Sequence, residues 1–320
     1  MSTSHEIHVD AQVPARASLL SRLRRLIGWW LRLPGLRALR PLAVRVLAVA
    51  EPAGRLSLKP LPAHLTARGC ETLTVLSANL WHDWPRRREW PERLESFAQL
   101  VEAESADIVL LQEVARTPGL RADEWLARRL GMAYTYSRAN GHEEAIGFEE
   151  GLAVFSRFPV VTPLLRHLGA RANPFVRRLA LGADVETPCG SLLVFSVHLG
   201  LLRRQNAEQL AHLRAWVGEA AGARGALIGG DFNAHERSSR IAQTQRMWLD
   251  TFRHLHPHAD GTTHELRWPG KLLLGRRRLG YLFLHPGERR WSVLEARHVD
   301  APGGPHSDHR AVLARLAPEL

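Results

Sequence analysis

The strongest constraint on the fold is an alternation, repeated from Glu71 onward, of short apolar runs with segments of helical periodicity. Short runs bounded by Gly, Pro and polar residues are typical of β-strands. Apolar residues three and four apart are typical of amphipathic helices, as in Trp90–Glu104, where Leu94, Phe97 and Val101 follow this spacing. Numerous strands with interspersed helices predict a layered α/β or α+β domain.

The predicted elements follow from these two patterns. The helices are expected at Trp90–Glu104, Leu120–Leu130 and Arg203–Ala221. The strands are expected at Leu73–Ala78, Asp107–Leu111, Gly151–Phe155, Leu179–Val185, Ser191–Val197, Ala226–Gly229, Tyr281–Leu284, Trp291–Ala296 and His309–Leu316.

The basic charge of the chain is concentrated near its N-terminus. The whole sequence holds 43 Lys and Arg residues against 32 Asp and Glu residues, a net charge of +11 that would suit a polyanion-binding protein. Residues 1–70 contribute 11 of the basic and three of the acidic residues, a net of +8. We therefore expect a basic N-terminal extension over residues 1–70 and a main domain over residues 71–320, whose net charge is only +3.

Residues 19–50 of the extension mix Leu, Val and Trp with seven Arg residues, and Pro34 and Pro41 divide them into short helical pieces. Three interpretations stay open. The segment is a helical extension that packs its apolar face on the main domain, an interfacial segment attracted to an anionic membrane or another polyanion, or a disordered segment.

Compartment and assembly are inferred from what the sequence lacks. No run of 18 apolar residues occurs, and the first twenty residues do not resemble a signal peptide. We expect a cytoplasmic protein, peripheral at the membrane if residues 19–50 bind lipid, and a monomer. Its two cysteines, Cys70 and Cys189, allow at most one disulfide and exclude a four-thiolate zinc site.

Polar residues stand at the ends of several predicted strands, and strand ends cluster at one rim of a sheet. The carboxylate and amide oxygens among them suit Mg²⁺ or Mn²⁺ better than zinc. A divalent ion held by such oxygens is what the hydrolysis of a phosphate ester needs. Taken singly, each residue also has an ordinary role as a turn, cap or hydrogen-bonded core residue. The residues at strand ends are Asn79, Gln112, Glu113, His198, Asp231, Asn233, Asp308 and His309.

The segments that contain these residues resemble the endonuclease/exonuclease/phosphatase superfamily, which has the deoxyribonuclease I-like fold. The matching segments follow the family's order between about Thr72 and Leu316. They are SANLW at Asn79, VLLQEV at Glu113, GLAVFSRFP at Gly151–Pro159, VFSVHL at His198, GGDFNA at Asp231 and Asn233, and SDH at Ser307–His309.

The resemblance implies a four-layered sandwich of two mixed β-sheets flanked by helices, and a divalent-metal-dependent phosphodiesterase. It implies that Glu113 ligates Mg²⁺ or Mn²⁺, and that Asn79 and Asp308 help to hold the ion or its waters.

It also implies the catalytic residues. Asp231 would orient or deprotonate the attacking water, and Asn233 and His198 would donate to the phosphoryl oxygens in the transition state. His309 would act either as a general base or as a cationic phosphate binder.

One position departs from the family's pattern. The family commonly has an Asp that orients the final His, and Gly280 stands in that place within Arg278–Phe283. Glycine cannot accept the hydrogen bond, so another group such as His306 or a water takes over, or activity is reduced. Gly280 therefore supports an alternative function, that of an impaired or non-catalytic protein that binds anionic surfaces, whereas the presence of Glu113, Asp231, Asn233 and His309 favours a working enzyme.

The substrate class stays open between nucleic acid and a phospholipid headgroup. The Ser196–Leu199 segment lacks the Tyr of the abasic-site branch, which disfavours abasic-site repair. Its His form is similar to deoxyribonuclease-like, sphingomyelinase-like and phosphoinositide-phosphatase-like branches alike. The aromatic loop Trp81–Trp84 would stack a base, enter a lipid interface or pack locally, and Arg276–Arg278 would bind phosphates or be solvated.

Overall fold

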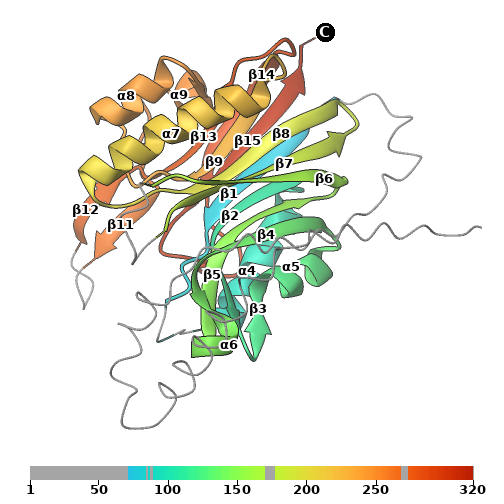
Figure 1. The fold of residues 1–320 in the computed structure, drawn as a ribbon, viewed down its shortest axis with the longest axis vertical. Helices are drawn as coiled ribbons and strands as arrows, with labels where there is room; N and C mark the ends of the chain where they lie inside the picture. The colour runs from blue at the N-terminus through green and yellow to red at the C-terminus, as the bar shows by residue number, and fades with distance from the viewer. Residues whose placement is uncertain (1–70, 84–85, 87–88, 170–176, 268–272, 320) are drawn as a thin grey trace, which may run out of the picture.

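The computed structural model describes residues 71–319, apart from residues 84–85, 87–88, 170–176 and 268–272, so the predicted extension over residues 1–70 lies outside the described residues. Within this part of the chain, two large mixed β-sheets pack face to face, and helices cover the outer face of each (Figure 1). The predicted four-layered sandwich is confirmed.

The first sheet has the strand order β14-β15-β1-β2-β5-β4, and β3 pairs with β2. Strands β1 and β2 are parallel, and the other pairings are antiparallel. Both central strands are apolar along most of their length because they are covered on both faces. The strands are β1 (Leu73–Asn79), β2 (Ile108–Thr117), β3 (Leu120–Arg121), β4 (Ala133–His142), β5 (Phe148–Ser156), β14 (Trp291–Val299) and β15 (Ala311–Pro318).

The second sheet has the order β10-β13-β9-β8-β7-β6, and β8 and β9 are its parallel pair. A separate two-stranded sheet, β11-β12, lies beside it. The strands are β6 (Val160–His167), β7 (Leu179–Thr187), β8 (Gly190–His198), β9 (Ala226–Asp231), β10 (Leu249–Asp250), β11 (His264–Arg267), β12 (Leu273–Arg277) and β13 (Gly280–His285).

Three apolar layers hold the sandwich together. The central layer joins residues such as Val75 and Leu110 of the first sheet to Val194 and Leu227 of the second. One outer layer packs α4 and α5 on the first sheet, and the other packs α7 and α8 on the second. The helices are α4 (Trp90–Ala103), α5 (Ala122–Leu130), α6 (Glu143–Ile146), α7 (Arg203–Ala221), α8 (Ser239–Gln245) and α9 (Thr251–Leu255).

The predicted strands and the three predicted helices are present, with shifted ends. Strand β15 begins at Ala311 rather than at His309. Within the described residues six strands are additional, namely β3, β4, β6, β10, β11 and β12. Of these, β4 buries polar residues, and β6 is an exposed edge strand that contains Pro163. No helix in the described part of the chain is long and apolar enough to cross a membrane.

Candidate active site

The C-terminal ends of two parallel strand pairs form the rim at which most of the predicted residues meet. The register of β1 and β2 places Asn79 beside Gln112, and that of β8 and β9 places His198 beside Asp231. The two sheets present these ends at the same edge of the sandwich. As a result, the Asn79 side-chain nitrogen lies 3.2 Å from Asp231 Oδ2.

Below the rim, buried side chains tie the two sheets to each other. Gln112 Nε2 donates to Ser196 Oγ at 3.1 Å, and the Ser196 hydroxyl donates to the Leu111 carbonyl at 2.8 Å. These groups are buried, and Gln112 Nε2 also donates to the Leu110 carbonyl at 3.1 Å. The pair therefore fixes how the strand ends of the two sheets face each other.

The Asn79 side-chain amide joins two carboxylates. Its nitrogen donates to Glu113 Oε1 at 3.1 Å and to Asp231 Oδ2 at 3.2 Å. Its oxygen accepts from the backbone N–H of Trp81 at 2.9 Å. Since both ends of the amide are fixed, it holds the Glu113 and Asp231 carboxylates next to each other.

Glu113 stands in a strained position of β2. Its φ of 55° is in the left-handed region, and the pairing of β2 with β5 shifts register between Leu111 and Val114. Such a backbone costs on the order of 1–3 kcal/mol for a residue other than glycine and is found mainly at functional sites. The irregularity takes the half-buried Glu113 out of the regular ladder of hydrogen bonds between β2 and β5. In this position, Glu113 Oε2 accepts a hydrogen bond from the backbone N–H of His82 at 3.4 Å.

Asp231 and Asn233 form a tight turn after β9. The backbone N–H of Asn233, whose φ is 47°, donates to Asp231 Oδ1 at 2.9 Å. Asn233 Nδ2 donates one hydrogen to the Leu199 carbonyl at 2.9 Å, which fixes the orientation of the amide. Burial raises the pKa of the Asp231 carboxyl, although the nearby His309 opposes this shift. Asp231 is therefore a stronger base than an exposed aspartate.

Two imidazoles face Asp231. His198 Nε2 lies 3.7 Å and His309 Nε2 lies 3.9 Å from Asp231 Oδ2, so both are in range of the carboxylate without a direct hydrogen bond. Burial holds the pKa of His198 well below its usual range, and the positive charge of Arg178 adds to the effect. His198 is thus a neutral ring at neutral pH.

The site also contains residues that sequence reasoning did not assign to it. His82 Nε2 lies 3.4 Å from Glu113 Oε2. Glu150 is buried in β5 and accepts a hydrogen bond from Asn140, and burial raises the pKa of its carboxyl, with His82 opposing. The sequence does mark Glu150, because two adjacent acidic residues within the apolar strand FEEGLAVFS are unusual.

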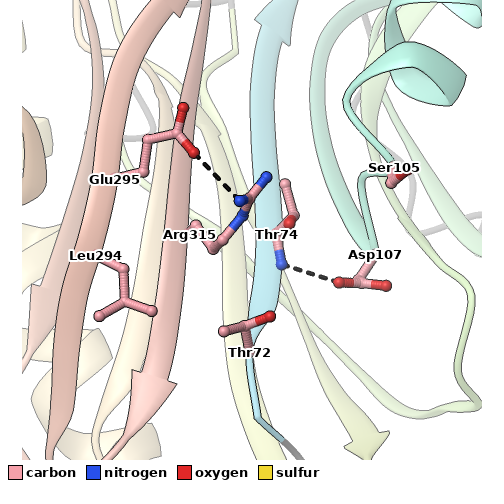
Figure 2. Close-up of a pocket in the computed structure, with 7 residues that line it drawn as sticks. All are labelled: Thr72, Thr74, Ser105, Asp107, Leu294, Glu295 and Arg315. Atoms are coloured by element: carbon pink, nitrogen blue, oxygen red, sulfur yellow. Dashed lines mark hydrogen bonds and ion pairs between the residues drawn. The ribbon is translucent and has the colours of Figure 1, made fainter.

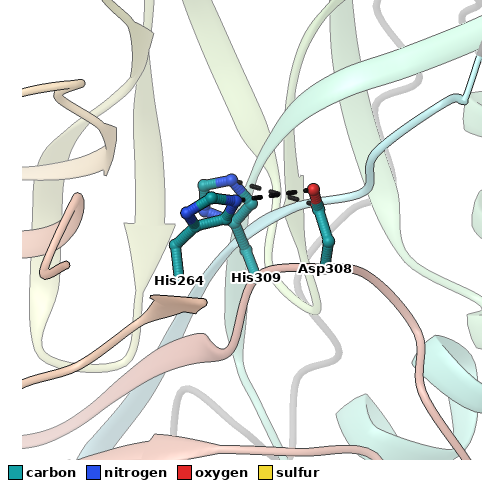
Figure 3. Close-up of side chains that lie close together, drawn as sticks. All are labelled: His264, Asp308 and His309. Atoms are coloured by element: carbon teal, nitrogen blue, oxygen red, sulfur yellow. Dashed lines mark ion pairs between the residues drawn. The ribbon is translucent and has the colours of Figure 1, made fainter. Parts of the chain in front are cut away.

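Asp308, like Asp231, approaches His309 Nε2, and both carboxylates lie 3.9 Å from that nitrogen. The two oxygens of Asp308 face two rings, with His264 Nε2 at 3.6 Å from Oδ2 and His309 Nε2 at 3.9 Å from Oδ1 (Figure 3). The two rings lie against each other, with centroids 4.5 Å apart. His264 was not predicted as a site residue, and no local pattern marks it, because its place depends on a bridge between β11 and His309.

The residues around Asn79 fit a hard divalent cation. Glu113 and Asp231 supply carboxylate oxygens that one amide keeps together. Oxygen donors of this kind are those that Mg²⁺ and Mn²⁺ prefer. Of the metal ligands predicted from the sequence, Asn79 and Glu113 belong to this group, whereas Asp308 contacts His264 and His309.

The sequence matches the Endonuclease/Exonuclease/phosphatase family over residues 76–309. The chain belongs to this family. Among curated proteins, none matches the sequence.

Several solved structures share the fold of the chain. An endonuclease/exonuclease/phosphatase from Beutenbergia cavernae is 22% identical with a TM-score of 0.61, covering 78% of this chain and 72% of its own. The human Nocturnin catalytic domain with bound sulfate is 18% identical (TM-score 0.62, 84% and 99% covered). D. rerio TDP2 complexed with a single-strand DNA product is 16% identical (TM-score 0.60, 77% and 98% covered).

The structure shows the surroundings of Gly280, the position at which this chain departs from the family's pattern. Gly280 pairs with Asp231 across β13 and β9, and its N–H donates to Thr263 Oγ1 at 3.0 Å. No carboxylate comes from this position, and the ring that contacts His309 is His264. The suggested substitute, His306, instead packs its ring against Phe97 at a centroid distance of 5.7 Å.

Contacts bear on two further surface predictions, for the loop Trp81–Trp84 and for the arginine run. The Arg93 guanidinium lies over the half-buried Trp81 ring at 4.8 Å, which indicates local packing of Trp81, whereas Trp84 lies outside the described residues. Of the arginine run, Arg276 and Arg277 are exposed, whereas Arg278 is 1% exposed and ion-paired with Asp250. Arg278 is therefore neither a solvated residue nor a phosphate binder.

A second hollow lies at the opposite end of β1 from Asn79 (Figure 2). Its charged groups already have partners, since Asp107 accepts from the Thr74 backbone N–H at 2.9 Å and Arg315 pairs with Glu295 at 3.5 Å. This hollow lacks the converging carboxylates and imidazoles of the family site. The rim at Asn79 is the candidate active site.

Proposed function

We propose that this protein is a divalent-metal-dependent phosphodiesterase that hydrolyses a phosphate ester of nucleic acid or of a phospholipid headgroup by attack of water. The observation that carries the proposal is the Asn79 amide between Glu113 and Asp231, at 3.1 and 3.2 Å. An amide that holds two carboxylates at a sheet rim beside two imidazoles has the donors that phosphoryl transfer to water requires.

Glu113 would ligate Mg²⁺ or Mn²⁺, and Asn79, whose nitrogen contacts Glu113 Oε1, would help to hold the ion or its waters. When bound, the ion would neutralise charge on the phosphoryl oxygens. Asp308, which faces His264 and lies like Asp231 within 3.9 Å of His309 Nε2, would help to hold the ion or its waters.

Asp231 would orient the attacking water and accept its proton. A burial-raised pKa suits this role because a stronger base takes the proton more readily. The hydrogen bond from the Asn233 backbone at 2.9 Å fixes one carboxylate oxygen, and Oδ2 faces the rim.

His198 and Asn233 would donate hydrogen bonds to the phosphoryl oxygens. A neutral His198 keeps one ring N–H for donation and does not need to be charged. Asn233 Nδ2 gives one hydrogen to the Leu199 carbonyl, which leaves the second hydrogen for a ligand. His309 would bind the phosphoryl group or take part in proton transfer, as predicted.

The substrate is proposed at the level of a phosphodiester. The TDP2 structure with a single-strand DNA product and the Nocturnin structure with bound sulfate support an anionic phosphate-type ligand for the fold. A cytoplasmic monomer that attaches to anionic membranes through residues 19–50 remains our proposal for location and assembly.

A second candidate function is supported by Gly280. Because this position provides no carboxylate for His309, the protein would be an impaired family member that binds anionic surfaces without turnover.

Hydrolysis of bis(4-nitrophenyl) phosphate separates the two candidates. The full chain should turn over this substrate with Mg²⁺ or Mn²⁺ and stop with EDTA, and Glu113→Gln should require more metal for half-maximal rate. Glu219→Gln, which removes a charge from an exposed position on α7, is the matched control. Absence of turnover with both ions would favour the binding protein. Plasmid DNA, single-stranded RNA and phospholipid vesicles then identify the substrate class.

A further inference from the structure

Most of the exposed apolar side chains in the described residues lie on two segments that flank the candidate active site. Nine large apolar side chains are exposed in this part of the chain, and five of them are leucines on these two segments. The first segment is the loop from β8 to α7, with Leu201 and Leu202, and the second is the sheet β11–β12, with Leu266, Leu273 and Leu274. Exposed apolar residues that gather beside a site indicate a partner.

Hydrogen bonds connect the first segment to the rim. The backbone N–H of Leu199 donates to the Asp231 carbonyl at 2.9 Å, and Asn233 Nδ2 donates to the Leu199 carbonyl at 2.9 Å. Leu201 and Leu202 follow directly in the chain, and they are 75% and 63% exposed. Two solvent-exposed leucines therefore lie within a few residues of the groups proposed for hydrolysis.

The residues at the start of α7 do not favour the helix that they begin. Leu202 is the N-cap residue and offers no side-chain acceptor, although Ser, Thr, Asp or Asn is preferred at this position. The helix continues with Arg203 and Arg204 and has no acidic residue in its first turn, whereas the helix dipole favours negative charge there. A sequence that opposes its own secondary structure is expected where the residues serve a function.

The second segment starts at the other side of the site. His264 is the first residue of β11, and its ring lies against that of His309 with centroids 4.5 Å apart. His309 Nε2 in turn lies 3.9 Å from Asp231 Oδ2. The two segments therefore approach Asp231 from its backbone and from its side chain.

The sheet β11–β12 leaves its apolar residues uncovered. It belongs to neither large sheet, and Figure 1 shows it at the periphery of the molecule, at the end where α7 begins. Two strands by themselves have no core in which to bury apolar side chains. Leu266, Leu273 and Leu274 are accordingly 40%, 38% and 50% exposed.

Basic residues accompany the leucines in both segments. Arg203 and Arg204 are exposed, and the sequence His264–Arg277 contains four basic residues against one acidic residue. Arg204 and Arg276 have carboxylate neighbours at 3.5 and 3.1 Å, whereas none is found for Arg203 and Arg277 among the described residues. A partner that complements both segments is therefore apolar as well as anionic.

These two properties select among the possible partners. Nucleic acid is anionic, but proteins bind it through polar contacts and through stacking on aromatic rings, which leucine does not supply. Residues 1–70 contain many leucines, but the arginines would repel their net charge of +8. A second copy of the same surface is repelled for the same reason. An anionic bilayer offers acyl chains to the leucines and phosphates to the arginines.

We propose that the exposed leucines of the two segments, together with the neighbouring arginines, form a docking surface for an anionic phospholipid bilayer. We call it the leucine surface, and it consists of Leu201, Leu202, Leu266, Leu273 and Leu274. Docking would bring the rim to the layer of lipid phosphates. Together with the proposed function, on which this part of the inference rests, the leucine surface selects a phospholipid headgroup rather than nucleic acid as the substrate.

Vesicle binding tests the leucine surface apart from catalysis. The full chain is sedimented with vesicles of phosphatidylcholine and phosphatidylserine. Two double variants, Leu201→Gln with Leu202→Gln and Leu273→Gln with Leu274→Gln, should each lower the partition coefficient by at least about tenfold, because less apolar area enters the lipid. Circular dichroism establishes that each variant is folded.

Leu294→Gln is the matched control for these variants. Leu294 is 54% exposed, but it lines the hollow at the opposite end of β1 from Asn79 (Figure 2). This variant should bind vesicles as the wild type does.

Hydrolysis then tests the choice of substrate. The two double variants should hydrolyse bis(4-nitrophenyl) phosphate at the wild-type rate but release headgroups from vesicles at least about tenfold more slowly. If the wild type hydrolyses neither substrate, the proposed function fails, whereas weaker vesicle binding by the variants still supports the leucine surface. Hydrolysis of bis(4-nitrophenyl) phosphate without release of any headgroup would overturn the choice of substrate.

Three results would overturn the leucine surface itself. The first is vesicle binding by both double variants that equals that of the wild type. The second is an equal loss of affinity for single-stranded DNA, which would assign the leucines to nucleic acid. The third is a wild-type dimer that the double variants dissociate, which would assign the leucines to a second copy of the chain.

Discussion

The buried ion pair between Arg278 and Asp250 should be the most sensitive electrostatic contact in the described domain. Arg278 Nη1 and Nη2 donate to the two oxygens of Asp250 at 2.8 and 2.6 Å, and both side chains are almost fully buried. Asp250 also caps α9 by accepting from the Arg253 backbone N–H at 3.2 Å. The pair anchors the start of β13, whose Gly280 lies opposite Asp231.

Asp250→Asn keeps the shape and the cap but removes the negative charge. Glu236 lies 3.6 Å from Arg278 Nη1 and already pairs with Arg253, so it compensates only in part. Leaving a buried guanidinium without its partner costs about 3–5 kcal/mol. For a domain of this size the loss corresponds to a fall in Tm of about 6–20 °C.

Urea denaturation followed by tryptophan fluorescence measures the free energy of unfolding, and a thermal scan measures Tm. The exposed pair of Glu219 with Arg166 provides the control, because Glu219→Gln should change stability by less than about 0.5 kcal/mol. The double variant Arg278→Met with Asp250→Asn should recover to within about 2 kcal/mol of the wild type, since no buried charge remains. A single variant within about 1 kcal/mol of wild type, or a double variant less stable than Asp250→Asn, would refute the reasoning.

Three other predictions concern acid sensitivity, the contact between the sheets and the N-terminal segment. Burial lowers the pKa of His298, whose ring stacks on Phe252 at 4.1 Å, to about 3. As the pH falls, the unfolded chain therefore takes up a proton at this residue before the folded chain does. The free energy of unfolding should consequently decrease as the pH drops from about 6.5 towards 3. His298→Leu should flatten this fall in pH-dependent urea melts, and an unchanged slope would contradict the assignment. Ser196→Ala should cost about 0.5–1.5 kcal/mol, because Gln112 and the Leu111 carbonyl each lose one hydrogen bond while Gln112 Nε2 keeps the Leu110 carbonyl as an acceptor; an unchanged free energy of unfolding would show that the tie is unimportant. The full chain should sediment with anionic vesicles less strongly as salt rises, and replacing Arg22, Arg24 and Arg25 by Gln should weaken sedimentation at low salt; equal sedimentation would exclude the segment as the anchor.

Strand-end reasoning predicted much of the site because the relevant information is local. Asn79, His198 and Asp231 each follow an apolar run that continues into the strand, and parallel pairing within each sheet brings neighbouring ends together. The residue pattern therefore places these groups at one rim, although their roles in catalysis stay predictions.

Other features depend on contacts between distant parts of the chain. His264 approaches His309 through a bridge that joins β11 to the segment before β15, and neither segment alone indicates that contact. Arg278 looked like one member of an exposed arginine run, but β13 carries it inward to Asp250. Strand β4 escaped notice because residues such as Arg138 and Asn140 are buried by pairing with Glu149 and Glu150 rather than exposed.

The most direct test of the central claim is the rate of Mg²⁺-dependent phosphodiester hydrolysis in Asp231→Asn relative to wild type. Asparagine retains the size of the side chain but cannot accept the proton of water, so kcat should fall by about 10²–10⁴-fold while the protein stays folded. Glu219→Gln should keep wild-type turnover. Equal turnover in Asp231→Asn and wild type, or wild-type turnover that persists in EDTA, would contradict a metal-dependent reaction centred on Asp231.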